Sequence, residues 1–142
     1  MIRLSALSAL AALSLSGCTT IPNDPGVPTT AAPPETPVAL RQPVTVGDVV
    51  VTPMKVVEDS RCPMNARCVW AGRVVVETRI DGAGWRDTAN VTLGEVYGTH
   101  QRTFALVSVT PEVMTGQEIS PQSYRFVYER RDDRMGGPPP AP

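Results

Sequence analysis

Several kinds of residue are scarce in this chain. Its 142 residues include one histidine, a single lysine, three cysteines and only 5% aromatic residues. Neither sign of charge dominates, since 13 basic residues stand against 14 acidic ones and the net charge is −1. Without a basic stripe the chain lacks the charge pattern of a nucleic-acid-binding protein. With so few histidines and cysteines it also lacks the ligands of a four-coordinate zinc site, and we expect no metal and no cofactor.

Long apolar runs are missing as well. The longest one, Leu4–Leu15, falls short of the roughly 20 residues that a transmembrane helix needs. It follows Arg3 directly, and a positive charge before a short apolar segment is typical of a secretory signal. The sequence therefore predicts an exported protein.

Residues 15–18 read Leu-Ser-Gly-Cys and resemble the lipobox of bacterial lipoproteins. The resemblance implies that the signal peptide 1–17 is removed and that Cys18 carries the acyl chains that bind the membrane. An ordinary secreted protein, cleaved after a pair of small residues, is the alternative. In Gram-negative lipoproteins an Asp after the cysteine favours the inner membrane, so Thr19 implies anchoring at the outer membrane, facing the periplasm.

Proline is concentrated on both sides of a middle region. Residues 18–43 hold seven prolines among small polar residues, and such a stretch favours an extended linker that reaches on the order of 70 Å. Residues 132–142 are rich in Gly and Pro and are predicted to be a disordered tail. The remaining region, 44–131, is long enough for one small domain.

This region alternates apolar and polar residues with the period of β-strands. The segment 103–109 is more uniformly apolar, as a central strand would be. Asp81–Gly84 predicts a hairpin turn, and Gly94–Gly98 predicts the end of the following strand. The pattern favours an all-β fold, a small antiparallel β-sandwich or partly open barrel. The strands are expected at 44–52, 54–58, 73–80, 85–93, 103–109 and 124–129, with Pro53 interrupting the first ladder.

Two cysteines remain once Cys18 is assigned to lipid. In an exported chain, Cys62 and Cys68 are expected to form a disulfide. The loop that it closes is short, so the bond should stabilise the domain by only about 2 kcal/mol. Five intervening residues in a β context favour a structural bridge over a redox-active Cys-x-x-Cys motif.

Residues 58–72 surround this pair and resemble a segment of small, uncharacterised bacterial envelope proteins. The similarity rests on Asp-Ser-Arg-Cys-Pro, a short gap, and Cys-Val-Trp-Ala-Gly. It spans about a tenth of the chain. The resemblance implies a family but no activity.

Arg61, Arg67 and Trp70 flank the bridge and have two interpretations. Exposed Arg and Trp on a rigid loop have the composition of a partner-binding hot spot. Alternatively, Trp70 packs into the core beneath the disulfide and both arginines are solvated. We expect the second arrangement, because tryptophan is usually mostly buried.

The function that fits these features is a non-enzymatic module. No nucleophile elbow, phosphate-binding loop or metal motif is present in the sequence. We expect a membrane-anchored lipoprotein whose domain binds an envelope partner, which the sequence does not name, or organises the envelope. The alternative is a small metal-handling protein or hydrolase centred on His100 and the Cys62–Cys68 loop. Copper bound by Met54, Met64 and His100, or calcium bound by Asp59, Ser60 and Asn65, would be variants of it.

Overall fold

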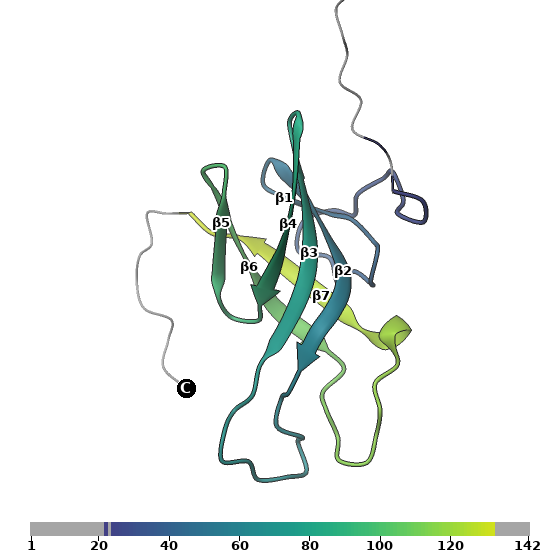
Figure 1. The fold of residues 1–142 in the computed structure, drawn as a ribbon, viewed down its shortest axis with the longest axis vertical. Coiled ribbons are helices and arrows are strands. Elements are labelled where there is room, and N and C mark those ends of the chain that lie inside the picture. The colour runs from purple at the N-terminus through teal and green to yellow at the C-terminus, as the bar shows by residue number, and fades with distance from the viewer. Residues whose placement is uncertain (1–21, 23, 133–142) are drawn as a thin grey trace, which may run out of the picture.

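The computed structural model describes residue 22 and residues 24–132. Within this part the chain forms two antiparallel sheets that do not close into a barrel (Figure 1). None of the described residues forms a helix that is long and apolar enough to cross a bilayer. Residues 1–17, which are expected to be a signal peptide, Cys18 and nearly all of the tail 132–142 lie outside the described residues. The first sheet contains β1 (Val44–Val46), β2 (Val49–Asp59), β3 (Val74–Gly82) and β4 (Trp85–Thr92), and the second contains β5 (Val96–Thr99), β6 (Arg102–Thr110) and β7 (Arg125–Arg130).

The all-β fold predicted from alternation is confirmed, and the inner faces follow the expected residues. On β3 the alternate positions are fully buried, and on β7 Phe126 and Tyr128 are buried while Arg125 is exposed. The apolar segment 103–109 lies in β6, which is the central strand of its sheet. The buried β3 residues of this face are Val74, Val76, Thr78 and Ile80.

A mixed aromatic and aliphatic core joins the two sheets. Phe104 of β6 and Tyr128 of β7 meet edge to face, with ring centroids 6.2 Å apart. The Tyr128 hydroxyl lies 3.0 Å from the Thr78 hydroxyl of the opposite sheet. This hydrogen bond satisfies two buried hydroxyls at once, so the polar ends of both side chains are tolerated in the core.

Two local predictions need correction. β2 runs through Pro53 without a break, because a register shift between Pro53 and Lys55 accommodates the missing N–H. The expected turn at Gly94–Gly98 contains a fifth strand, β5, whose Val96 pairs with Ala105 of β6. Edge strands this short carry little alternation, so a segment containing two glycines looked like a turn.

The packed structure also begins earlier than residue 44, within the segment 18–43 that was expected to be an extended linker. Val38 is fully buried, and its backbone N–H and C=O both bond to Phe126 at 2.9 Å. Ala32 likewise bonds to Pro43 and Thr45 through its N–H and C=O. A proline removes only its own donor, so the residues between prolines remain free to extend a sheet.

Residues 22 and 24–31 continue along the end of the sandwich that carries the β3–β4 turn, here called the hairpin end. The Asp24 carboxylate lies 3.6 Å from the Arg79 guanidinium and 3.7 Å from that of Arg41. Arg86, the second residue of β4, donates from Nη1 to the Pro22 carbonyl at 2.7 Å. The described chain thus enters the fold at the hairpin end (Figure 1).

Candidate binding surface at the disulfide loop

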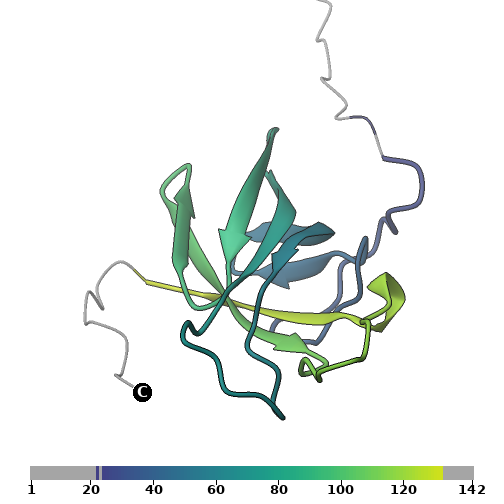
Figure 2. The ribbon, with the colours of Figure 1, turned by 60° about the horizontal axis from the view of Figure 1, so that its bottom comes forward.

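The opposite end of the sandwich, here called the loop end, carries the segment 60–73 between β2 and β3. Figure 2, in which this end comes forward, shows the segment projecting beyond the strands. Its base is closed by backbone pairing, since the Ser60 N–H donates to the Arg73 carbonyl at 2.8 Å. The Arg73 N–H returns a bond to Ser60 Oγ at 3.0 Å, and the Cys62 N–H donates to Ala71 at 3.3 Å. The segment is therefore a closed loop whose two ends adjoin.

Gly72 is required for this closure. Its φ is +69°, and a Cβ at this position would lie 1.7 Å from the Ser60 carbonyl oxygen. Any side chain would therefore collide with backbone in addition to adopting a strained conformation. This glycine ends the Cys-Val-Trp-Ala-Gly segment, so part of that sequence is explained by the geometry of the loop base.

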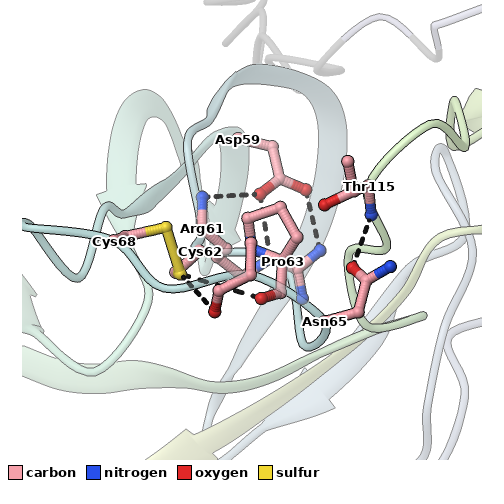
Figure 3. Close-up of a disulfide and its surroundings, with 8 residues drawn as sticks. Asp59, Arg61, Cys62, Pro63, Asn65, Cys68 and Thr115 are labelled. Atoms are coloured by element: carbon pink, nitrogen blue, oxygen red, sulfur yellow. Dashed lines mark hydrogen bonds and ion pairs between the residues drawn. A yellow bond between two sulfur atoms is a disulfide. The ribbon is translucent and has the colours of Figure 1, made fainter.

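The predicted disulfide is confirmed. Cys62 and Cys68 are bonded across a Cα–Cα distance of 5.8 Å, which lies within the usual range for a disulfide (Figure 3). The bond closes a small ring inside the larger loop. The residues between the two cysteines are thereby restrained covalently as well as by the loop base.

The Arg61 side chain is mostly covered instead of solvated, which corrects one expectation. It forms a two-pronged ion pair with Asp59, with Nε–Oδ1 at 2.8 Å and Nη2–Oδ2 at 2.7 Å. The two side chains are only 12% and 10% exposed. Arg61 also donates to the carbonyls of Val109 and Pro111 at 2.9 and 3.0 Å. It therefore ties the disulfide loop to the end of β6 and is not available to a partner.

Tyr124 completes this buried network. Its hydroxyl donates to Asp59 Oδ2 at 2.9 Å. Burial and this hydrogen bond raise the pKa of Tyr124 to about 12. Burial alone would raise the pKa of Asp59, but the hydrogen bonds from Arg61 and Tyr124 outweigh it and lower that pKa below its usual range. Asp59 is thus held ionised as the acceptor at the centre of the network.

A second loop, 111–119, lies beside the disulfide loop. The Met64 N–H donates to the Val113 carbonyl at 2.9 Å, and the Thr115 N–H donates to Asn65 Oδ1 at 2.8 Å (Figure 3). The oxygens considered as calcium ligands on Asp59 and Asn65 therefore already accept hydrogen bonds. These contacts join the two loops into one ordered end of the domain.

Trp70 lies at the surface, and the expectation that it packs into the core is wrong. Its side chain is 82% exposed, and the adjacent Val69 is 90% exposed. Met64 and Met114 add further exposed apolar side chains on the same two loops. We refer to Met64, Val69, Trp70 and Met114 as the Trp70 surface.

Arg67 fits the partner-binding interpretation better than Arg61 does. It is exposed, and none of the ion pairs or hydrogen bonds among the described residues involves its side chain. Of the three residues that the sequence singled out, Arg67 and Trp70 are presented to solvent and Arg61 is structural. Met114 was missed, because nothing in its local sequence indicates that loop 111–119 lies beside the disulfide.

His100 lies at the hairpin end, away from the disulfide loop. Its ring stacks on Trp85 with centroids 4.0 Å apart, and its Nε2 is 3.7 Å from Asp87 Oδ2. β3 separates the hairpin end from the loop end, and its nine residues span about 27 Å. His100 and the Cys62–Cys68 loop, or His100 and Met64, therefore do not form one site.

Other candidate sites are sparse in the described part of the chain. No group of three or more His, Cys, Asp or Glu side chains there is arranged to hold a metal ion. A polar hollow of about 60 Å³ lies between the β1–β2 turn and the end of β7. It is lined by charged residues that already pair, such as Arg102 with Asp48 and Arg130 with Asp132. It is much smaller than a typical ligand pocket.

Comparison of the chain with protein-family models, curated proteins and solved structures finds no match. The geometry of the domain and the sequence motifs are therefore the basis of the functional interpretation.

Proposed function

We propose that this protein is a membrane-anchored bacterial lipoprotein whose β-domain acts as a non-enzymatic binding module. The anchor rests on the lipobox-like residues 15–18, in which Cys18 takes the position of the acylated cysteine. One acyl chain binds a membrane only reversibly, whereas the two or three chains of a lipoprotein cysteine hold it durably.

The observation that carries the binding role is the exposure of Trp70 on a restrained loop. An 82% exposed tryptophan buries little of its apolar surface, so it contributes little to the stability of the fold. The disulfide and the buried Arg61–Asp59 pair already fix the loop that carries it. A partner would therefore meet a preorganised surface and pay little for ordering it. Trp and Arg, the residue types of Trp70 and Arg67, are also those enriched in hot spots.

Crosslinking in intact cells tests this role. A photoreactive amino acid at position 70 should give a discrete crosslinked product, and the same group at Val96 should not. Val96 is a matched control, since it is also apolar and 61% exposed but lies on β5. Equal products from both positions would contradict a binding surface centred on Trp70.

The anchor has its own test. Cys18→Ser should abolish acyl labelling and release the protein from the membrane fraction. Cys62→Ser should leave both unchanged, because this cysteine is in the disulfide. Membrane association that survives Cys18→Ser would remove the lipoprotein assignment.

A metal-handling or hydrolytic role at His100 remains the second candidate. The observation in its favour is Asp87, which the fold brings to His100 although the two are distant in sequence. The same Asp87 oxygen accepts a hydrogen bond from Thr99 at 2.7 Å, so it is shared. Metal analysis of purified protein and a His100→Ala variant separate the candidates, since only this second role depends on the imidazole.

A further inference from the structure

The position at which the chain enters the domain determines which end of an anchored domain would lie closest to the membrane. Pro22 is held by Arg86 at the hairpin end, and Asp24 is held by Arg79 and Arg41, which lie between that end and the middle of β3. Arg41 adds a hydrogen bond to the Pro25 carbonyl at 2.7 Å. The residues that follow the expected lipid anchor are thus attached to one particular end of the sandwich.

Only four residue steps separate Cys18 from Pro22. A fully extended chain covers at most about 3.6 Å per residue, so the two Cα atoms lie within about 14 Å of each other. This limit is far shorter than the reach of an extended linker over residues 18–43. An acylated Cys18 would therefore keep the hairpin end close to the bilayer.

The Trp70 surface lies at the other end of the domain. β3 runs about 27 Å from the hairpin turn to its first residue, Val74, which pairs with Asp59 at the base of the disulfide loop. The loop and its neighbour 111–119 project further in the same direction (Figure 1). The length of the sandwich therefore separates Trp70 from the point where the chain enters.

We propose that the short connection from Cys18 holds the hairpin end against the membrane and directs the Trp70 surface away from it, toward a protein partner. This inference rests on the proposed lipid anchor and specifies the binding role. The anchoring bilayer cannot then be what Trp70 contacts. The chemistry of the surface calls for a partner with an apolar pocket for the indole and a nearby carboxylate for the free guanidinium of Arg67.

Fluorescence quenching tests the orientation. Acylated full-length protein is reconstituted into phosphatidylcholine and phosphatidylglycerol vesicles that carry a spin-labelled headgroup. Trp70→Phe leaves Trp85 as the only tryptophan, and Trp85→Phe leaves Trp70. The emission of Trp85, at the hairpin end, should be strongly quenched, whereas that of Trp70 should be retained. Quenching of Trp70 equal to or stronger than that of Trp85 would overturn the orientation.

A matched control isolates the short connection. A flexible Gly-Ser insertion of roughly ten residues between Thr20 and Ile21 frees the domain to rotate and should abolish the difference between the two tryptophans. A difference that persists would show that the connection does not set the orientation. Failure of the protein to bind vesicles at all is a separate result, which contradicts the anchor itself.

The chemical class of the partner is tested by crosslinking from position 70 in intact cells. The product should contain protein, and Arg67→Glu should reduce it severalfold because the charge facing the partner is reversed. The comparable charge reversal Lys55→Glu, at an exposed position in the middle of β2, should leave the yield unchanged. A crosslink to lipid, or a yield insensitive to Arg67, would refute a protein partner at this surface.

Discussion

Each end of the sandwich carries one tryptophan, and the two differ in how far they are buried. At the hairpin end, Trp85 is half-buried, lies across Gly82 and stacks on His100. A Cβ added at Gly82 would fall 2.1 Å from the Trp85 ring, so the backbone has made room for the indole. At the loop end, Trp70 is 82% exposed. The fold thus covers the indole of Trp85 near a turn, whereas it leaves the indole of Trp70 at the loop end exposed.

The means of restraint differ as well. Each end has a mostly buried ion pair, Arg79–Asp81 at the hairpin end and Arg61–Asp59 at the loop end. The hairpin end adds exposed pairs, such as Asp24 with Arg41, which contribute little individually. What distinguishes the loop end is its disulfide, a covalent restraint. The covalent restraint therefore supports the end with the more exposed apolar side chains. This distribution is expected of a surface that must keep its shape without the help of its own packing.

The largest effect is expected from removing the buried cation of the loop end. Arg61→Ala leaves Asp59 ionised and unpaired in a site that is largely closed to water, and should lower the free energy of unfolding by about 3 kcal/mol. Urea denaturation of the soluble Cys18→Ser chain measures this. Arg67→Ala, which removes an exposed guanidinium, is the control and should change stability by less than about 0.5 kcal/mol. Similar values for both would contradict the structural role of Arg61.

The disulfide should come next. Replacing Cys62 and Cys68 together by serine removes the crosslink, and is expected to cost about 2 kcal/mol and lower the melting temperature by roughly 10 °C. Calorimetry with and without a reductant checks this, because the reduced parent chain should match the double variant. Two free thiols in native protein under non-reducing mass analysis would contradict the bond itself.

Tyr124 should give a smaller effect with a distinctive pH dependence. Its folded pKa, about 12, exceeds the value of about 10 for an unfolded tyrosine, so the folded state holds the phenolic proton more tightly. The corresponding stability is complete below about pH 10 and is lost as the pH rises toward 12. Tyr124→Phe should cost about 1.5 kcal/mol at neutral pH and make the alkaline decline shallower.

Urea unfolding at a series of alkaline pH values measures that slope. Part of the decline should persist in the variant, because burial also raises the pKa of Tyr128. A slope unchanged by Tyr124→Phe would show that the bond to Asp59 does not hold the proton.

The smallest changes in stability are expected from replacing the two tryptophans. Trp85→Ala removes a half-buried ring and its stack on His100, and should cost about 1 kcal/mol. Trp70→Ala should stay within about 0.5 kcal/mol of the parent, since its indole packs against little. Thermal unfolding of both variants measures these two changes in stability. A larger loss from Trp70→Ala would mean that this residue supports the fold.

Alternation alone predicted most of the fold. β3 and β7 were found from buried residues at every second position, and the hairpin at Asp81–Gly84 from its turn chemistry. β5 was missed because a four-residue strand that includes Gly98 carries too little alternation. The buried Val38 was missed because the surrounding prolines dominate the composition of that segment, while its two hydrogen bonds to Phe126 depend on a strand that lies far away in sequence.

The candidate site was predicted in part, since Cys62, Cys68, Arg67 and Trp70 all belong to it. The exposure of Trp70 and the burial of the Arg61 side chain were not predictable from the sequence. Average burial favours a buried tryptophan and a solvated arginine. Arg61 is buried because carbonyls of Val109 and Pro111, about fifty residues further along the chain, complete its hydrogen bonding. Such long-range partners leave no trace in the local sequence.

The closed base of the disulfide loop determines where residues can be inserted or replaced without disturbing the sheets. Because Ser60 and Arg73 are bonded to each other, the segment between them leaves and rejoins the sheet at one point. The entropy cost of a loop rises only slowly with its length, so residues between the cysteines can be exchanged or added while β2 and β3 keep their register. The loop is therefore a natural graft point, where a foreign peptide would be displayed in a constrained ring on the same two sheets, at the cost of the Asn65 bond to loop 111–119.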